Sequence, residues 1–311
     1  MEIAIIGAGM AGLACGTALA KAGHGVRLFD KGRGPGGRMS TRRGAVDGQT
    51  LHFDHGAQYF TARDPAFLEM VADWERHGLA ARWPAAGEDA WVGTPTMNTP
   101  LRAMAEALGV EFERRVLSIL DGSGWVLHFE DGGREGPFDT VLVSVPAEQA
   151  GDLLRGPQPQ YAATADSVSS DPCWTMMAAF DQKPDLPDTL RNRGAIGWAA
   201  RNNAKPGRAE TECWVVQASP EWSRGHLEQD PDMVASALLA ALAAESGNSL
   251  PTPSYLTAHR WRYARCHALD RGALWDASTR LGVCGDWLSG PRVENAFLSG
   301  RALARMVAGD G

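Results

Sequence analysis

The chain has 311 residues, of which 44% are hydrophobic and 22% charged, and its formal net charge is −7. This length is enough for one large domain or two modest ones, and the acidic charge without a basic tract argues against nucleic acid as a partner. The longest apolar stretch, residues 235–244, is much shorter than the roughly 20 residues of a membrane-spanning helix. Because the amino terminus also lacks the basic region of a signal peptide, we predict a cytoplasmic protein without a membrane partner.

Five cysteines are scattered along the chain, and no two of them form a C-x-x-C motif. Their odd number and their spacing are typical of reduced thiols in a cytosolic protein. His52 and His55 are the nearest histidine pair, but no companion ligands stand at a spacing that a metal needs. We therefore predict no metal site.

The first forty residues carry the strongest local pattern of the chain. An apolar, β-branched run precedes three glycines, an Ala- and Leu-rich stretch, a second apolar run and an acid. This order predicts a strand, a tight turn, a helix, a second strand and a carboxylate, as in dinucleotide-binding folds. The parts are residues 2–6, the G-x-G-x-x-G glycines Gly7, Gly9 and Gly12, the helix up to Ala22, residues 26–29 and Asp30.

Each part of this pattern has a role in binding a dinucleotide. Gly7 permits the sharp turn, Gly9 lets the backbone approach a pyrophosphate, and Gly12 lets the helix pack closely on the strands. The amino terminus of the helix offers unpaired N–H groups and a positive dipole to the phosphates. Asp30 is placed to accept hydrogen bonds from the adenosine ribose, and its charge disfavours the 2′-phosphate of NADP.

The glycine motif alone does not separate FAD from NAD, but the following residues favour FAD. Gly36, Gly37 and Arg38 form a GGR element, which in many FAD enzymes brings an arginine and backbone amides to the pyrophosphate. No second G-x-G-x-x-G motif stands between a predicted strand and a helix, so a reductase with separate FAD and NAD domains is not expected.

The next part of the chain alternates predicted helices and strands. Residues 50–62 combine β-forming residues with polar side chains, which indicates either a backbone close to a ligand or an exposed turn. Asp64 and Pro65 are typical of a helix start. The predicted helices cover 64–77 and a segment from Thr99 to 108, and the predicted strands cover 111–120, 124–131 and 138–146, with turns at 121–124 and 131–136.

Residues 155–165 are rich in Pro and Gln and indicate a crossing between domains. Asp230 and Pro231 predict the start of another helix, which ends at Gly247. The stretch 251–263 holds aromatic and basic residues and forms either an edge strand, with arginine stems packed on rings, or part of a site. Further strands are predicted at 173–180, 194–200 and 213–219.

The carboxyl-terminal stretch contains the second informative pattern. An apolar strand ends on Gly285 and Asp286, and a helix rich in small residues follows. We expect this segment to complete the first domain, with Asp286 near a ribityl or ribose hydroxyl. The helix start near Val293 is placed to favour negative charge on a reduced flavin ring. The alternative is a helix that only covers the sheet.

Motifs spread over nearly the whole chain support a more specific assignment. They are GAGMAGL, FDKGRGPGGRMSTRR, FDHGAQYFTARDPAF, GWAARNNAKPGR, WVVQASPEWS, HRWRYA, and GDW with RVENAFLSG. Together they resemble the bacterial renalases, which belong to the flavin amine oxidase superfamily.

The resemblance implies an α/β fold like that of monoamine oxidase and p-hydroxybenzoate hydroxylase, with a Rossmann-type FAD-binding domain and a mainly β-sheet substrate domain. It implies non-covalent FAD and a small-molecule dihydropyridine nucleotide as substrate, namely a 2- or 6-dihydro isomer of NAD(P)H. O2 is then the final acceptor, and NAD(P)+ and hydrogen peroxide are the products. We expect the FAD-binding domain at 1–70, 98–155 and 265–311 and the substrate domain at 71–97 and 156–264.

The resemblance also implies site residues, position by position. The FAD contacts are Gly7, Gly9, Met10, Ala11, Gly12, Asp30, Lys31, Gly37, Arg38, Met39, Val116, Asp286, Val293 and Glu294. The substrate contacts are His55, Gln58, Tyr59, Thr96, Trp198, Arg262 and Tyr263. No catalytic residue is assigned, because a dihydropyridine is already a strong hydride donor and asks the protein mainly for orientation.

Two other functions stay open. A true amine oxidase of this superfamily usually holds a lysine near the flavin. Outside the amino-terminal unit only Lys183 and Lys205 are available, and each directly precedes a proline in a predicted turn, a poor place for a buried catalytic lysine. A flavin-binding protein without turnover would share every cofactor motif.

Overall fold

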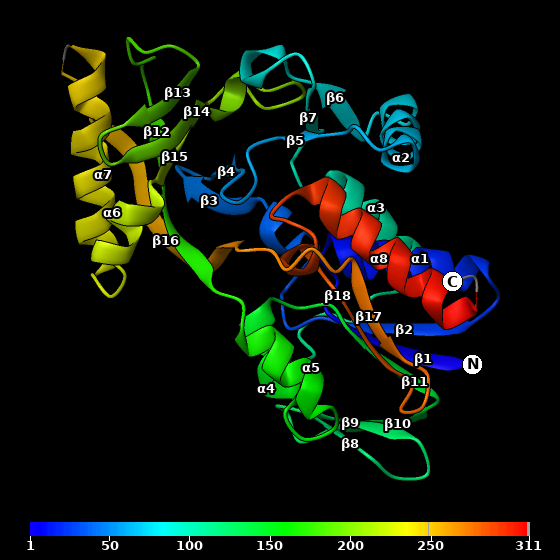
Figure 1. The fold of residues 1–311 in the computed structure, drawn as a ribbon. Coiled ribbons are helices and arrows are strands. Elements are labelled where there is room, and N and C mark those ends of the chain that lie inside the picture. Colours follow the sequence, from blue (N-terminus) through cyan, green and yellow to red (C-terminus); the bar gives the residue numbers. More distant parts are fainter. Residues whose placement is uncertain (248, 310–311) are drawn as a thin grey trace.

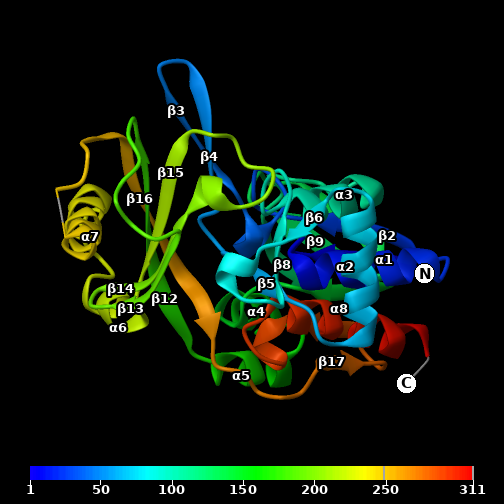
Figure 2. The same cartoon turned by 90° about the horizontal axis from the view of Figure 1, so that it is seen from above.

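The computed structural model describes residues 1–247 and 249–309. The chain folds into two lobes that lie side by side, one built around a mainly parallel sheet and the other around an antiparallel sheet (Figures 1 and 2). The first strand of the chain and its last helix, residues 2–6 and 293–308, both belong to the first lobe (Figure 1). The second lobe is therefore an insertion between strands of the first.

The first lobe forms around β1 (Glu2–Ile6), which is buried after its first residue. β1 pairs in parallel with β2 (Gly25–Phe29) on one side and with β11 (Thr140–Val143) on the other. α1 (Met10–Lys21) connects β1 to β2, which confirms the predicted order of strand, turn, helix and strand. The sheet is completed by β18 (Leu281–Cys284), parallel to β11, and by the antiparallel edge strand β17 (Ala273–Asp276).

Helices cover this sheet, and the last one confirms that the carboxyl-terminal segment completes the lobe. α8 (Val293–Ala308) packs against α1 so closely that a Cβ at Gly300 would overlap the carbonyl oxygen of Ala11. α3 (Thr99–Leu108) also packs on α1. Gly300, one of the small residues of this segment, thus lets the two helix backbones touch.

α2 (Pro65–Arg76) begins as predicted, because Asp64 Oδ1 accepts a hydrogen bond from the Ala66 N–H at 2.8 Å. Its apolar face packs on the first lobe, where the rings of Phe67 and Phe297 lie 5.0 Å apart. A small sheet beside it joins the same core. This sheet consists of β5 (Phe60–Thr61), β7 (Ala90–Gly93) and β6 (Ala80–Arg82).

The predicted strand at 138–146 and the turn before it are partly wrong. Arg134–Phe138 forms a separate strand, β10, which folds back on its neighbour so that Phe138 pairs with Trp125. Only the apolar run beyond it enters the central sheet as β11. The antiparallel sheet on this side contains β8 (Val116–Leu120), β9 (Trp125–Phe129) and β10.

The segment 155–165, predicted as a crossing between domains, is mostly helix α5 (Pro159–Asp166), and its place at a domain boundary stays a prediction. Pro159 stands at the first turn, where a proline is tolerated. Ala162 and Ala165 are buried, and α5 packs against α4 (Ala147–Leu154), which the sequence did not reveal. Two buried alanines at helical spacing outweigh the Pro- and Gln-rich composition.

The second lobe is a sheet of antiparallel strands with α7 (Pro231–Ser246) on one face. Asp230 caps α7, as predicted, by accepting a hydrogen bond from the Asp232 N–H at 2.9 Å. The stretch for which the sequence left an edge strand or a site role open forms β16 (Pro253–Cys266), which lies at the edge of this sheet. The sheet order is β13 (Thr189–Arg193), β14 (Ile196–Arg201), β15 (Glu212–Ala218), β12 (Ser170–Phe180) and β16, and α6 (Pro220–Gly225) lies beside β12.

A hairpin from the amino-terminal part of the chain reaches onto the second lobe. β3 (Arg42–Val46) and β4 (Gln49–Phe53) pack against β16 and β15, and Phe53 shares a core with Met177 and Val215. The predicted domain ranges stay a prediction, but this hairpin crosses between the lobes. Short 3-10 helices lie at η1 (Gly37–Met39), η2 (Pro84–Ala86), η3 (Asn202–Ala204) and η4 (Asp286–Leu288).

Three further features of residues 1–247 and 249–309 bear on function. No helix there is long and apolar enough to cross a membrane. The cysteines are all free thiols. No group of three or more His, Cys, Asp or Glu side chains in that part of the chain is arranged to hold a metal ion.

The contact between α1 and α8 yields the first prediction. Gly300→Ala places a methyl group against the backbone of α1, so we expect a loss of about 1–3 kcal/mol in the free energy of unfolding. Urea denaturation measures this loss. Gly225→Ala is the matched control, because no heavy atom lies within 4 Å of its Cβ position. Equal stability of the two variants would contradict the close helix contact.

Candidate active site

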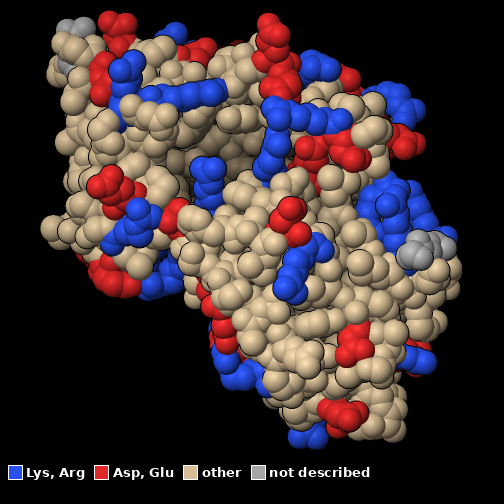
Figure 3. Space-filling view, in the orientation of Figure 1, with Lys and Arg blue, Asp and Glu red and all other residues tan. Residues whose placement is uncertain are grey.

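A large cavity lies between the two lobes, and Figure 3 shows it as a hollow flanked by Lys and Arg side chains. Its volume is about 2680 Å³. Since a pocket for one small organic molecule measures about 300–1,000 Å³, this cavity has room for a dinucleotide and a second ligand. The carboxyl ends of β1, β2, β11 and β18 meet at its wall, the place where open α/β sheets bind ligands.

The glycine turn forms one end of the cavity. Gly7 has φ +103°, and a Cβ there would overlap the carbonyl oxygen of Ser144, so only glycine fits. Gly9 has open space around its Cβ position. Gly12 lies behind the wall, where a Cβ would overlap the Gly7 carbonyl, so its role is close packing rather than ligand contact. The predicted contacts Gly7, Gly9, Met10 and Ala11 line the cavity.

The amino terminus of α1 is free to bind an anion. Its cap residue, Gly9, offers no side-chain hydrogen bond, and no acidic residue stands in the first turn. The first N–H groups therefore keep their positive dipole for a ligand. Asp30 lines the cavity beside them and accepts hydrogen bonds from the N–H groups of Ala8 and Gly32, both at 2.7 Å.

Arg38 and Asp286 come from distant parts of the sequence and form an ion pair in the cavity wall. Arg38 Nη2 lies 2.5 Å from Asp286 Oδ1. Burial alone lowers the pKa of Arg38, but Asp286 more than offsets this and keeps the guanidinium charged. Gly37, Met39 and Lys31 line the cavity nearby, and Lys31 Nζ donates to Gln149 at 2.8 Å.

The start of α8 contributes less than the sequence indicates. Val293 lines the cavity, as does Val116 from β8. Glu294 is buried, and its Oε1 accepts hydrogen bonds from the backbone N–H groups of Arg63 and Asp64 at 2.5 and 2.7 Å. Because the Glu294 carboxylate binds the N–H groups that precede α2, only the backbone of Glu294 is available for the predicted FAD contact.

The predicted substrate residues divide into two groups. His55, Thr96, Trp198, Arg262 and Tyr263 line the cavity. Gln58 and Tyr59 lie behind the wall: Gln58 accepts a hydrogen bond from Lys205 at 3.1 Å, and the ring centroid of Tyr59 lies 5.4 Å from that of Trp198. Gln58 and Tyr59 therefore support the wall.

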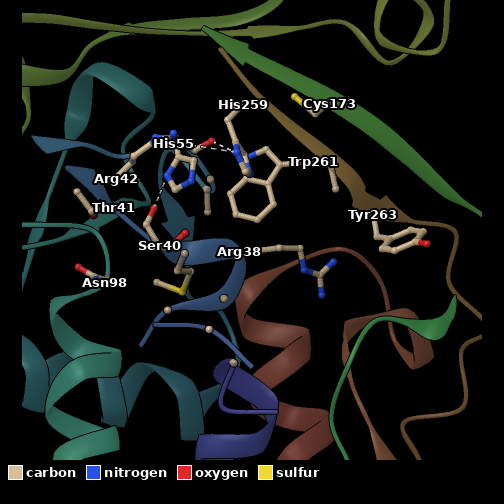
Figure 4. A pocket seen from close by; sticks show the side chains of 18 of the residues that line it. Arg38, Ser40, Thr41, Arg42, His55, Asn98, Cys173, His259, Trp261 and Tyr263 are labelled. Carbon is tan, nitrogen blue, oxygen red and sulfur yellow. Dashed lines mark hydrogen bonds between the residues drawn. The ribbon is translucent and has the colours of Figure 1, made fainter. Parts of the chain in front are cut away.

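Two lining residues that the sequence did not single out are His259 and Trp261, although both lie in the HRWRYA motif. Their rings surround His55, with centroids 5.0 and 4.9 Å from it (Figure 4). Trp261 Nε1 donates to the His55 carbonyl at 2.9 Å. Alternation along β16 brings both side chains to the face that meets the hairpin.

Both histidines are neutral at pH 7. Burial, followed by the charges of His259 and Arg42, lowers the pKa of His55 to about 3. Burial and Arg42 lower the pKa of His259 to about 4. His55 Nδ1 donates to the Ser40 carbonyl at 3.1 Å, while His259 Nδ1 accepts from Arg42 at 3.2 Å, so the two rings hold different tautomers.

Asp54 sits at the centre of a buried charge network under the cavity floor. Its carboxylate pairs with Lys205 Nζ at 3.2 Å and Arg208 Nη2 at 2.6 Å, and it accepts hydrogen bonds from Thr41 and the Met97 N–H. Burial raises the pKa of Asp54, but Lys205 and Arg208 hold it well below its usual range.

This network corrects the expectation for Lys205. Its side chain is fully buried, although Pro206 follows it. Burial lowers the pKa of Lys205 to about 8, with Arg208 acting in the same direction and Asp54 against it. A turn before a proline can thus bury a lysine when a carboxylate and two amide oxygens receive its hydrogen bonds. Those acceptors are Asp54, Gln58 and Asn202.

Two protein-family models match the chain. Residues 5–74 match the NAD(P)-binding Rossmann-like domain, and residues 76–308 match the flavin containing amine oxidoreductase. The second match covers most of the chain.

The chain belongs to the flavin-containing amine oxidoreductase family. One curated relative, hydroxyneurosporene desaturase of Rubrivivax gelatinosus, is 35% identical over 114 residues. That match covers 35% of the chain and 21% of the desaturase, so the chain spans about a fifth of this relative.

Solved structures show the same fold over the whole chain. An engineered triple mutant of putrescine oxidase is 15% identical with a TM-score of 0.75, covering 100% of this chain and 99% of its own. A putative protoporphyrinogen oxidase from Exiguobacterium sp. 255-15 is 13% identical with a TM-score of 0.76 and the same coverage. Cyclohexylamine oxidase from Brevibacterium oxydans IH-35A is 13% identical, with a TM-score of 0.73 and 99% coverage of both chains.

These findings confirm the predicted fold class and the cofactor. The flavin amine oxidoreductase has a Rossmann-like FAD-binding lobe and a β-sheet lobe, and its cofactor is FAD. The geometry fits FAD, because free N–H groups at α1, an open approach at Gly9 and the half-buried Arg38 lie at the same end of the cavity. The narrower resemblance to renalases stays a prediction.

Asp54→Asn tests the buried network of this flavin amine oxidoreductase. The substitution leaves Lys205 and Arg208 as buried cations without a negative partner, so we expect the free energy of unfolding to fall by about 3–5 kcal/mol. Urea denaturation of the FAD-loaded protein measures it. The control is Asp89→Asn, which breaks an exposed pair with Arg63 and is expected to cost about 1 kcal/mol or less. A loss at Asp54 as small as the control's would refute the network's role.

The neutral histidines predict a pH dependence of stability. His55 and His259 titrate at about 3 and 4 in the folded protein and at about 6.5 when unfolded, so the unfolded chain binds more protons between these values. Stability therefore falls as the pH drops below about 6.5, by up to about 1.4 kcal/mol per pH unit for each histidine. Urea midpoints between pH 7.5 and 5 measure the slope.

The double variant His55→Gln, His259→Gln is expected to flatten this slope. His77→Gln is the control, because His77 is exposed at the end of α2, and this variant should leave the slope unchanged. Identical slopes in the double variant and the wild type would show that other groups cause the acid sensitivity.

Proposed function

We propose that this protein is a flavin-dependent oxidase of dihydropyridine nucleotides. Its substrate would be a 2- or 6-dihydro isomer of NAD(P)H, and its products NAD(P)+ and hydrogen peroxide. When bound, FAD supplies the hydride-accepting and oxygen-reducing chemistry. The proposal rests on the resemblance in sequence motifs and on one property of the cavity, its charge.

The charge of the cavity lining is the observation that carries the proposal. Thirteen of the lining residues are Lys or Arg and four are Asp, although the chain as a whole is acidic. Some of these cations are neutralised by carboxylates. Those without an ion pair among the described residues are Lys31, Arg33, Arg42, Arg43, Arg102, Arg265 and Arg292. Such a lining attracts an anionic dinucleotide and repels an ammonium ion.

The acidic residues in the lining are already engaged. Asp286 pairs with Arg38, Asp171 pairs with Arg224, and Asp30 accepts two backbone hydrogen bonds. Asp152 Oδ1 lies 3.6 Å from Nη2 of Arg155, the residue that follows α4. Within the described residues, the lining therefore offers no unpartnered carboxylate to hold a substrate amine.

The chain's own residues hold, orient and shield the reactants. Gly9, the α1 amino terminus, Arg38 and Asp286 would hold FAD. Trp198, Trp261 and Tyr263 line the cavity from the second lobe and would orient a flat ring. His55 and His259 are neutral, and Lys205 lies outside the lining, so hydride donation by a dihydropyridine needs no proton from these residues.

Oxidation of an amine is the second candidate. The family and the amine oxidases among the similar structures favour it, and Lys205 is buried, contrary to the sequence-based expectation. However, Lys205 is held by Asp54 beneath the cavity floor rather than in the lining. A flavin-binding protein without turnover is the remaining alternative.

Anaerobic reduction of the bound FAD distinguishes these functions. We expect the flavin absorbance near 450 nm to bleach within seconds on mixing with a 2- or 6-dihydro isomer of NAD(P)H, and NAD(P)+ to form in equal amount. Readmission of oxygen should restore the colour with release of hydrogen peroxide. The observation to make is the absorbance trace in a stopped-flow instrument.

The same measurement with putrescine, cyclohexylamine and other amines provides the comparison. Faster bleaching by an amine than by either isomer would establish amine oxidation. Absence of bleaching by all candidates would favour a binding protein without turnover.

A further inference from the structure

Arg42 is a half-buried cation in the cavity lining that has no negative partner. It begins β3, and its Nη1 donates to His259 Nδ1 at 3.2 Å. No carboxylate in residues 1–247 and 249–309 forms an ion pair with it. Its charge acts on both cavity histidines and helps to keep them neutral. The cluster of Arg42, His55, His259 and Trp261 therefore carries one net positive charge among aromatic rings.

A guanidinium withdrawn from water is costly unless an anion or several acceptors compensate it. Two other arginines of the lining meet that condition, since Arg208 pairs with Asp54 and Arg262 pairs with Glu228 at 2.7 and 3.0 Å. Arg42 has only a neutral ring nitrogen as acceptor. The missing compensation points to an anionic group that comes with a ligand.

The cofactor does not account for Arg42. Arg38 lies four residues earlier, yet the two side chains lie on opposite sides of His55 and Trp261 (Figure 4). Arg38 belongs to the wall that contains Asp286, at the glycine-turn end of the cavity, whereas Arg42 meets the second lobe through His259. Residues 38–42 thus place Arg38 at the glycine-turn end of the cavity and Arg42 at the end on the second lobe.

We propose that Arg42 binds a phosphate of the substrate's diphosphate and so selects a nucleotide over the free dihydropyridine. This inference rests on the proposed function, because only a nucleotide substrate brings the phosphate. A guanidinium matches phosphate oxygens with two parallel hydrogen bonds, which a neutral ring nitrogen does not saturate. The neighbouring Arg43 is exposed and lies on the other face of the strand, so it contributes to the surrounding field instead.

The test compares ligands with and without phosphate. Titration of the FAD-loaded protein with NAD+ and with nicotinamide riboside, followed by flavin absorbance, gives two dissociation constants without turnover. We expect the wild type to bind NAD+ at least tenfold more tightly than the riboside. Arg42→Met should weaken NAD+ binding about tenfold or more and leave riboside binding unchanged. Arg42→Lys should restore part of the loss, and the loss should shrink at high salt.

Arg193→Met is the control, because this arginine is exposed on β13 and does not itself line the cavity. FAD content and urea midpoints check that each variant is folded and loaded, and Arg42→Gln replaces the methionine variant if the latter fails to fold. Unchanged NAD+ binding in a folded Arg42 variant overturns the inference. The proposed function has a separate test, which is bleaching of the wild-type flavin by a dihydro isomer of NAD(P)H. If neither isomer bleaches it, the proposed function and the inference about Arg42 are both overturned.

Discussion

The buried carboxylate of Asp54 is the interaction on which the cavity depends. It joins the end of the β3–β4 hairpin, the Met97 backbone and the loop around Lys205 and Arg208, which come from distant parts of the chain. A buried charge of this kind is stable only when every partner is in place. The network therefore holds the floor of the cavity in one geometry, with Asn202 and Arg208 in its lining.

Above this floor, the cavity has two chemically different ends. The glycine-turn end offers backbone N–H groups, a helix dipole and the Arg38–Asp286 pair, which suit the phosphates and sugar of FAD. The end on the second lobe offers aromatic rings, neutral histidines and an uncompensated Arg42. The fold is shared with putrescine oxidase and cyclohexylamine oxidase at 13–15% identity, so fold alone does not distinguish the substrates of these proteins.

His55 and His259 limit the positive charge at the second-lobe end of the cavity. A protonated imidazole beside Arg42 would add a second positive charge in a confined space, and burial together with Arg42 prevents it. Their hydrogen bonds also fix opposite tautomers, so His259 accepts from Arg42 while His55 donates to the backbone. The cluster of Arg42, His55, His259 and Trp261 is therefore aromatic and carries a single positive charge, that of Arg42.

Local patterns in the sequence determined the glycine turn, α1, the capped helices α2 and α7, and the FAD cofactor, because each depends on residues close in the chain. They did not reveal the helix α5 within a Pro-rich stretch. They also missed β10, which pairs with β9 where the sequence predicted a turn. Only the tertiary structure placed Arg38 on Asp286, committed Glu294 to the entry of α2 and buried Lys205 against Asp54. Such pairs join residues 150 or more positions apart, and the charge that each side chain keeps for a ligand depends on those distant partners.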